Sequence, residues 1–344
     1  MPTCSKHIIY SAKEKLHAPD QEWNFGRMVP YPEKEIRGET IINELKLRGY
    51  DSLLEETSDQ DIGYLESVHS SEMINHIRSC QSLPESEAIY PHIFPYHHYG
   101  HSESEINYRM AGYFCFDVGT IIGKNTFVAA KAAADTAVQG ARCLLENDRD
   151  RVFALCRPPG HHADYKHYGG YCYFNNAAAA ANLLSTRGKT AILDLDYHHG
   201  NGTQGIFYHT PTVYYISIHG DPRENYPYFS GFAAEKGEGL GYGHNLNLPL
   251  SGSVGDNEYF QALDQALQKI SDYNPYYLII SMGFDTFVKD PLGDFKLSEE
   301  AFRRIGTRIE QMKIPTLTCL EGGYDVDDLG DNATNYAETF LELT

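Results

Sequence analysis

Short runs of β-branched and apolar residues alternate along the chain with longer stretches of helical character. The expected strands are residues 151–156, 190–196, 212–217, 276–281 and 315–320. The expected helices are residues 127–146, 176–187, 257–271, 298–313 and 329–343. This alternation predicts an α/β fold in which helices cover both faces of a parallel sheet. Ligands bind beyond the carboxyl ends of the strands in such sheets, so functional residues are expected there.

The chain of 344 residues contains no internal repeat, low-complexity tract or break in composition, so we expect a single domain over residues 1–344. Residues 83–109 are crowded with Pro, His, Tyr and Glu and show no clear periodicity. They predict a long excursion loop. Its histidines, His97, His98 and His101, are not spaced like the ligands of a closed zinc site, and we expect them to belong to a loop.

The charge balance is acidic, with 28 Lys and Arg against 47 Asp and Glu and a formal net charge of −19. This balance disfavours nucleic acid and anionic membranes as partners and suits a cationic polyamine or a lysine side chain, although solubility alone would also explain it. Seven dispersed cysteines without a Cys-x-x-Cys pair indicate reduced thiols. The apolar patch at residues 8–10 is too short for a signal peptide or a membrane span, so we expect a cytoplasmic location.

Acidic and imidazole side chains follow two of the expected strands. Asp194, Asp196 and His198 alternate at the end of one strand, and strand geometry would point all three the same way. A buried cluster of this kind is costly without compensation, which a divalent cation would supply, whereas a surface turn is the alternative. Asp285 follows another strand and is the natural further ligand, unless it is only a capping residue at the end of that strand. Three protein ligands with one open position are typical of catalytic zinc, and Fe²⁺ or Co²⁺ would also fit.

Two other strand ends carry residues suited to acid–base chemistry. The run Arg-Pro-Pro-Gly-His161-His162 fixes neighbouring histidines on a rigid turn after residues 151–156. Either histidine could act as a general base, because imidazole titrates near neutrality. Tyr324 follows Glu-Gly-Gly after the last expected strand, where its phenol can donate a hydrogen bond to an oxyanion.

The ordered set R-P-P-G-H-H-A, G-Y-C-Y-F-N-N-A-A, D-L-D-Y-H-H-G-N-G-T-Q, G-F-D-T-F and E-G-G-Y resembles the histone deacetylase and acetylpolyamine amidohydrolase family. The resemblance runs from about His7 to the C-terminus, and S-I-H-G-D-P is most similar to the bacterial acetylpolyamine amidohydrolases. It implies an arginase-deacetylase-like α/β domain with a central parallel sheet of about eight strands. It also implies a zinc-dependent deacetylase and a homodimer.

The resemblance assigns the metal ligands residue by residue. Asp196, His198 and Asp285 would hold zinc, while Asp194 would hydrogen-bond His161 and help to hold a structural K⁺. The first K⁺ site would also use the carbonyls of Asp196 and His198, together with Ser217 and Ile218. A second K⁺ site would use carbonyls around Phe207, Thr210, Val213 and His244.

The resemblance also implies the mechanism, in which zinc and the two histidines activate a water that attacks the amide. His162, oriented by Asn201, would be the general base and then the general acid. An amide at position 201 should leave His162 less basic than a carboxylate would. His161 would give mainly electrostatic help, and Tyr324 would stabilise the oxyanion. The acyl-amine tunnel would be lined by Gly170, Tyr171 and Tyr226, with Cys172 as a packed thiol.

Several alternatives stay open from the sequence. The substrate could be an acetylpolyamine or an acetyl-lysine in a protein, because Glu103, Glu105 and Asp117 do not match the family's acidic positions. An arginase-type enzyme would need a second acid two residues after Asp285, where Phe287 stands. A non-catalytic acyl-amine sensor is a further alternative, although all the ligands and catalytic residues are present.

Overall fold

One parallel sheet organises the computed structural model, which describes residues 8–95, 107–146 and 150–343. Its strands are β1 (Ile8–Tyr10), β4 (Leu54–Glu56), β7 (Arg151–Leu155), β8 (Thr190–Asp194), β9 (Val213–Gly220), β10 (Asn245–Leu250), β11 (Tyr277–Met282) and β12 (Thr316–Leu320). They are ordered β10-β9-β8-β11-β12-β7-β1-β4, and every neighbouring pair is parallel. The sheet confirms the expected α/β class and its size of about eight strands.

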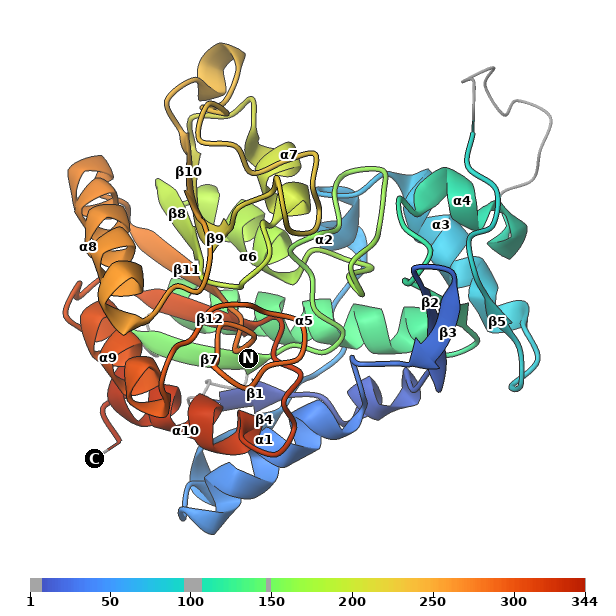
Figure 1. Cartoon of the computed structure of the whole chain (residues 1–344), viewed down its shortest axis with the longest axis horizontal. Coiled ribbons are helices and arrows are strands. Elements are labelled where there is room, and N and C mark those ends of the chain that lie inside the picture. The colour runs from blue at the N-terminus through green and yellow to red at the C-terminus, as the bar shows by residue number, and fades with distance from the viewer. Residues whose placement is uncertain (1–7, 96–106, 147–149, 344) are drawn as a thin grey trace.

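Helices cover both faces of this sheet (Figure 1). On one face lie α5 (Thr126–Leu145) and α6 (Asn176–Ser185), and on the other lie α1 (Ile36–Leu47), α8 (Asp256–Tyr273), α9 (Glu299–Glu310) and α10 (Leu329–Phe340). Successive residues of β8 alternate between the two cores. Ile192 packs in the α5 and α6 core, whereas Leu193 packs in the other. Shorter helices are α2 (Gly63–Glu66), α3 (Ser71–Ser79), α4 (Ala111–Phe114) and α7 (Asn201–Phe207).

Side-chain caps and small residues explain where the main helices begin and how closely they pack. Asn175 Oδ1 accepts a hydrogen bond from the Ala178 amide at the start of α6. At the start of α9, Ser298 Oγ accepts one from the Ala301 amide. In α5 the alanine-rich face lies flat on the sheet. A Cβ added at Gly140 would come within 2.5 Å of Leu317 Cδ1, so this contact requires glycine.

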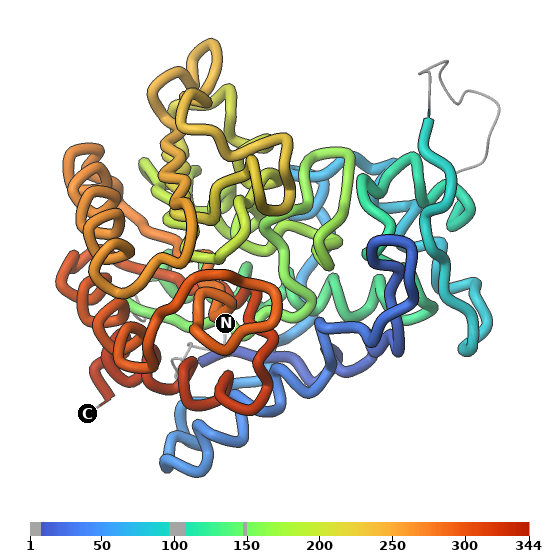
Figure 2. Tube along the Cα trace, viewed as in Figure 1, coloured from blue at the N-terminus to red at the C-terminus, as the bar shows by residue number. Residues whose placement is uncertain are grey.

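Two small antiparallel sheets lie outside the central sheet. One is the hairpin of β2 (Gln21–Asn24) and β3 (Arg27–Pro30), and the other pairs β5 (Ala88–Ile89) with β6 (Ile122–Gly123), which is distant in the chain. The hydroxyl of Tyr90, next to β5, donates to the Gln21 carbonyl oxygen at 3.0 Å, so the two small sheets are in contact. In Figure 2 the blue β2–β3 hairpin lies at the opposite side of the molecule from the orange helix α8.

The five expected strands and five expected helices are all present, with ends that differ by at most three residues. Three strands of the central sheet were missed, as were the four strands of the two small outlying sheets. β1 and β4 have only three residues each, and the edge strand β10 carries asparagines where an apolar run would signal a strand. Within the expected loop 83–109, the described residues include β5 and the turn Tyr108–Met110. His97, His98, His101, Glu103 and Glu105 lie outside the described residues.

Two features of the structure bear on membrane association and on the redox state of the cysteines. Within the described ranges no helix combines the length and apolar character needed to cross a bilayer. Cys80, Cys115, Cys156, Cys172 and Cys319 are buried free thiols, whereas Cys143 is disulfide-bonded, so the expectation of reduced thiols is wrong for Cys143.

The carboxyl ends of β7, β8, β9, β11 and β12 lead into the loops that carry the expected site residues. These loops are residues 156–175, 195–200, 221–244, 283–298 and 321–328. Because all the strands are parallel, the loops meet at one edge of the sheet.

The buried residue His76 allows a test of how burial in the core affects the dependence of stability on pH. Its ring is fully buried and stacks on Phe114 and Tyr168, with centroid distances of 4.8 and 5.7 Å. Burial lowers the pKa of His76 from 6.5 to about 4. Between these pH values the unfolded chain binds a proton that the folded protein excludes, so stability falls as the pH decreases through this window.

We expect His76→Gln to reduce the pH slope of the unfolding free energy near pH 5 by about 1 kcal/mol per pH unit. Urea unfolding at pH 7, 6 and 5 measures this slope. His209→Gln is the matched control, because His209 is exposed in the folded protein and should leave the slope unchanged. An unaltered slope in His76→Gln would contradict the assigned protonation change.

A candidate metal centre in an aromatic-lined pocket

Asp196, His198 and Asp285 form a cluster at the carboxyl edge of the sheet. His198 Nδ1 lies 3.3 Å from Asp196 Oδ1 and 3.0 Å from Asp285 Oδ2. Ligand atoms about 2.1 Å from a tetrahedral zinc ion are separated by about 3.4 Å, so these spacings suit one ion. The set of two carboxylates and one imidazole also matches the ligands that divalent transition metals take in proteins. The residues present therefore fit a single metal ion.

The other oxygens of the two carboxylates are held by backbone amides. The Gly322 amide donates to Asp196 Oδ2 at 2.8 Å, and the Tyr197 amide donates to Asp285 Oδ1 at 2.9 Å. These contacts fix the carboxylate orientations, as supporting hydrogen bonds do around metal ligands. A cation would find the ligand atoms already directed toward one point.

Electrostatics at this cluster favour a cation. Burial and the nearby Asp196 charge raise the pKa of Asp285 to about 7. Burial lowers the pKa of His198, but hydrogen bonds to Asp196 and Asp285 outweigh it and raise the pKa to about 9. In the metal-free protein His198 is therefore protonated at neutral pH and compensates the paired carboxylates. A bound divalent ion would replace this proton.

Asp194 does not share the cluster, and this corrects the strand-based expectation. β8 ends at Asp194, whose Oδ1 accepts a hydrogen bond from the Asp196 amide at 3.3 Å. The chain turns there, so simple alternation no longer places residues 194, 196 and 198 on one side. Asp194 Oδ2 instead contacts His161 Nδ1 at 3.2 Å and accepts from the Tyr215 hydroxyl at 2.8 Å.

The two neighbouring histidines differ in protonation state. Burial lowers the pKa of His161, but the charges of Asp196 and Asp194 outweigh it and raise the pKa to about 10. Burial lowers the pKa of His162 well below its usual range, and the charges of His161 and His198 lower it further. At neutral pH His161 is an imidazolium and His162 a neutral imidazole.

The orientation of His162 is also fixed. Its Nδ1 lies 2.7 Å from Asn201 Oδ1, so Nδ1 carries the proton and donates it to the amide oxygen. Nε2 is then left as a proton acceptor. Gly170 has a φ of 58°, and a Cβ there would lie 2.3 Å from His162 Cδ2, so the ring requires glycine beside it.

A pocket of about 510 Å³ opens above this group. His162, His198 and Tyr324 contribute to its lining, as do Gly170, Tyr171 and Tyr226. The Tyr226 ring lies perpendicular to His162, with centroids 5.0 Å apart, and the Tyr171 and Tyr324 rings are 5.8 Å apart. The structure thus brings the expected tunnel residues beside the expected catalytic residues. The other lining residues are Glu22, Trp23, Asn24, Phe25, Gly26, Asp117, Val118, Gly119, Tyr197, Glu224, Asn225, Tyr228 and Leu292.

Asp117 braces the pocket wall. Its Oδ2 accepts hydrogen bonds from the Gly170 amide at 2.6 Å and from the Tyr226 hydroxyl at 3.0 Å. Its Oδ1 accepts from the amides of Gly119 and Thr120 at 3.0 and 2.8 Å. Both oxygens are therefore engaged, and the carboxylate connects the two walls of the pocket.

Tyr324 keeps its phenolic proton at neutral pH, because burial raises its pKa well above 10. The Arg37 guanidinium lies 4.9 Å from the centre of the Tyr324 ring. Arg37 Nη2 and Nε also donate to the carbonyl oxygens of Glu321 and Gly323, each at 2.6 Å. Arg37 thus fixes the loop that carries Tyr324.

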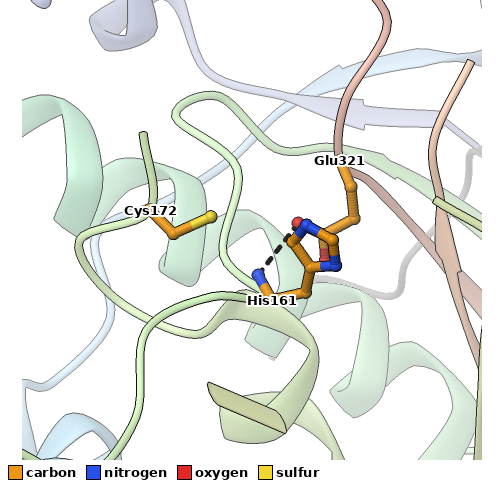
Figure 3. A group of neighbouring side chains, drawn as sticks. All are labelled: His161, Cys172 and Glu321. Carbon is orange, nitrogen blue, oxygen red and sulfur yellow. Dashed lines mark hydrogen bonds between the residues drawn. The ribbon is translucent and has the colours of Figure 1, made fainter. Parts of the chain in front are cut away.

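Figure 3 shows a second cluster, formed by His161, Cys172 and Glu321. Glu321 Oε2 accepts hydrogen bonds from the amides of Gly160 and His161 at 2.7 and 3.1 Å. The Cys172 thiol donates to the Gly170 carbonyl oxygen at 3.3 Å and is fully buried. Glu321 therefore holds the turn that presents the two histidines, and Cys172 is a packed thiol as expected.

The residues expected to hold K⁺ lie on neighbouring segments. Asp194 and Ser217 are paired in register across β8 and β9, with Ile218 next in β9. At the other end of β9, the Thr210 amide donates to the Phe207 carbonyl oxygen at 3.2 Å. The Tyr215 amide donates to the His244 carbonyl oxygen at 3.1 Å, and Val213 begins the strand.

Sequence reasoning missed the part of the pocket that comes from the β2–β3 hairpin. Glu22, Trp23 and Phe25 lie more than 130 residues before the first histidine motif, and no pattern connects them to it. Glu22 Oε2 is buried without a hydrogen-bond partner among the described residues. The one available signal was Phe25-Gly26, a turn dipeptide that places an aromatic residue where a small polar one is usual.

Comparisons with known proteins agree with this geometry. Residues 31–340 match the family model described as the histone deacetylase domain. The chain is 39% identical to acetylpolyamine amidohydrolase 2 of Pseudomonas aeruginosa over 96% of this chain and 98% of that protein. It is 35% identical to the acetylpolyamine amidohydrolase of Mycoplana ramosa, over 95% and 97%. A crystal structure of acetylpolyamine aminohydrolase from Burkholderia pseudomallei superimposes with a TM-score of 0.90 at 32% identity, covering 97% and 98%.

The pKa of His198 predicts how metal affinity depends on pH. Its pKa of about 9 means that binding must displace a proton below this pH, and Asp285 adds a second proton below about 7. We expect the apparent Kd for Zn²⁺ to increase about tenfold for each pH unit lowered between pH 9 and 7. Competition with a chelator at several pH values measures it.

Asp285→Asn should lose most of this affinity, because one of the three ligands no longer carries charge. The exposed Asp272→Asn should bind as the wild type does. A Kd that is constant from pH 9 to 7 would show that His198 does not exchange a proton for the metal.

Proposed function

Because the chain belongs to the histone deacetylase family, we propose that it is a metal-dependent deacetylase that hydrolyses the amide of an acetylated amine. The observation that carries this proposal is the position of the Asp196, His198 and Asp285 cluster beside His162 and Tyr324 at one pocket. We assign zinc as the metal, since the ligand set fits it; Fe²⁺ and Co²⁺ fit the same ligands. Bound there, the ion supplies Lewis acidity to the amide carbonyl and to the attacking water.

His162 is the proposed general base. Its neutral state and its proton on Nδ1 leave Nε2 free to accept a proton from water as the water oxygen bonds to the carbonyl carbon. The same Nε2 then donates this proton to the amine nitrogen when the C–N bond breaks. The products are acetic acid and the amine, which exchange the remaining proton to give acetate and the ammonium form. Asn201 keeps the ring in the required tautomer throughout.

His161 and Tyr324 act on charge. His161 stays protonated beside Asp194 and offers positive charge near the reacting groups, which favours the negatively charged transition state. Tyr324 donates its phenolic hydrogen to the oxygen of the former carbonyl as charge develops there. Neither residue needs to transfer a proton for this role.

The pocket supports an acetylated polyamine as substrate. Tyr171 and Tyr226 provide apolar walls for a methylene chain, and Glu22 places a carboxylate in the lining. Burial raises the pKa of Glu22 and the Tyr171 hydroxyl only partly offsets this, so a distal ammonium group near the buried Oε2 would stabilise the charged carboxylate. Acetyl-lysine in a protein is the alternative substrate, and it lacks this ammonium group.

Further parts of the proposal concern ions, assembly and location. We assign one structural K⁺ to Asp194, Ser217 and Ile218, and a second to Phe207, Thr210, Val213 and His244. A homodimer would cover the exposed aromatic side chains near the pocket mouth, Phe25 and Phe229, which are 91% and 92% exposed. We also propose a cytoplasmic location, because five of the six described cysteines are free thiols and only Cys143 is disulfide-bonded.

Two other functions fit the site less well. An arginase-type metal pair would need an acid at position 287, where the Phe287 side chain is buried in the core. A non-catalytic acyl-amine sensor would not need a neutral His162 and a protonated Tyr324 at the same metal cluster.

The function can be tested with zinc-loaded protein and three competing substrates, acetylputrescine, acetylspermidine and an acetyl-lysine peptide. We expect turnover of the polyamines to exceed that of the peptide. Tyr324→Phe should retain zinc and lose about 100-fold in kcat, and His162→Ala should lose turnover almost completely. Metal-loaded wild type that is inactive on all three substrates would favour the sensor, and unchanged turnover in Tyr324→Phe would remove its assigned role.

Glu22→Gln tests the substrate class. We compare acetylputrescine with N-butylacetamide, which has the same carbon chain but no ammonium group. The variant should lower the kcat/KM preference for acetylputrescine about tenfold, as expected for losing a charged hydrogen bond. Because burial raises the pKa of Glu22 to about 7, the wild-type preference should also decline as the pH falls below 7.

Glu224→Gln is the matched control, because Glu224 lines the same pocket but is exposed, so water and salt screen its charge. We expect a smaller loss of preference in this control. Equal losses in both variants would show that the preference comes from the overall negative charge of the pocket and not from a contact with Glu22.

A further inference from the structure

Two aspartates accept hydrogen bonds from backbone amides of the loop that carries Tyr324. The Gly322 amide donates to the metal-cluster residue Asp196. The Tyr324 and Asp325 amides both donate to Asp290 Oδ2, at 2.6 and 3.2 Å. Between these anchors lies Gly323, with a φ of 120° that residues with side chains rarely adopt. The loop therefore depends on its anchors, because glycine itself imposes little restriction.

Asp290 belongs to a short segment that touches three parts of the site. Its Oδ1 accepts a hydrogen bond from the Leu292 amide at 2.9 Å, and Leu292 lines the pocket. A Cβ added at Gly293 would lie 1.9 Å from the carbonyl oxygen of Asp285, so the segment packs directly on the backbone of a candidate metal ligand. Asp290 itself is buried, with 7% of its surface exposed. One carboxylate thus joins the pocket wall to the Tyr324 loop.

We propose that Asp290 is a positioning residue that acts through Tyr324. By accepting both amides, it sets the backbone at position 324 and so directs the phenol toward the metal cluster. This inference rests on the proposed function of Tyr324. Asp290 lines no part of the pocket and so does not contact the substrate, and its effect should appear in the chemical step.

Asparagine at position 290 would remove this support without changing the size of the side chain. It has a single acceptor oxygen, so its NH₂ group must face either the Leu292 amide or the Tyr324 and Asp325 amides. With its oxygen toward Tyr324 and Asp325, the side chain offers these amides only a neutral acceptor, which binds them less strongly than the carboxylate does, and its NH₂ group meets the Leu292 N–H. In the other orientation both loop amides lose their acceptor. In either case the loop is held less firmly and the phenol would leave its position, while the Tyr171 and Tyr226 walls remain.

The test compares wild type, Asp290→Asn, Tyr324→Phe and the double variant, each loaded with zinc. We expect Asp290→Asn to lower kcat between about 10- and 100-fold, up to the loss seen when an oxyanion donor is removed. KM should change less than about threefold, because the walls that bind the substrate stay in place. In the Tyr324→Phe background, Asp290→Asn should have no further effect on kcat, since residues that act through one group are not additive.

Asp256→Asn is the matched control. Asp256 likewise accepts a backbone amide, that of Ser298 at 3.0 Å, but at the start of α9 and outside the pocket lining. It should lower the melting temperature without changing kcat. Zinc content and melting curves are measured for every variant. If Asp290→Asn does not fold, Asp290→Glu, which retains the charge but displaces the carboxylate, replaces it in the same cycle.

The outcomes separate the two proposals. An active wild type and a slower Tyr324→Phe, combined with unchanged kcat for the position 290 variant, would overturn the inference about Asp290. It would also be overturned if the loss at position 290 recurred in full in the Tyr324→Phe background. An inactive wild type, or a fully active Tyr324→Phe, would instead overturn the proposed function.

Discussion

The burial of three carboxylates at one edge of the sheet is the constraint on which the rest of the site depends. Asp194, Asp196 and Asp285 are all excluded from water. Charges in this position are costly unless each one is paired and hydrogen-bonded. The structure meets the requirement with backbone amides and two protonated histidines, His161 and His198. A divalent ion would meet it more fully, which is why the same residues favour a metal.

This negative charge also explains how two adjacent histidines come to differ. His161 faces Asp194 and Asp196 and is held in the protonated state. Burial lowers the pKa of His162 most, and the charges of His161 and His198 lower it further, while the hydrogen bond to Asn201 raises it too little to outweigh them. Identical side chains thus acquire different protonation states through their surroundings. The glycine at position 170 contributes by allowing His162 to pack closely against the chain.

The candidate metal cluster and the mouth of the pocket come from different parts of the molecule. The metal cluster, the histidines and Tyr324 stand on loops that follow strands of the central sheet, where rigid strands fix their positions. The pocket mouth is built instead from the β2–β3 hairpin and from the loop after β9. Asp117 connects the two regions by binding both the Gly170 amide and the Tyr226 hydroxyl. The mouth can therefore vary in sequence while the reaction centre stays the same.

The sequence alone determined the α/β class, five central strands and the candidate ligands Asp196, His198 and Asp285, because each depends on patterns within a few residues. Only the tertiary structure separated Asp194 from the cluster by geometry, since the chain turns where strand alternation would have continued. Tertiary structure also decided the protonation of the two histidines and brought Glu22 and Asp290 to the site. Those features depend on contacts between residues that are distant in the chain, and no local pattern records such contacts.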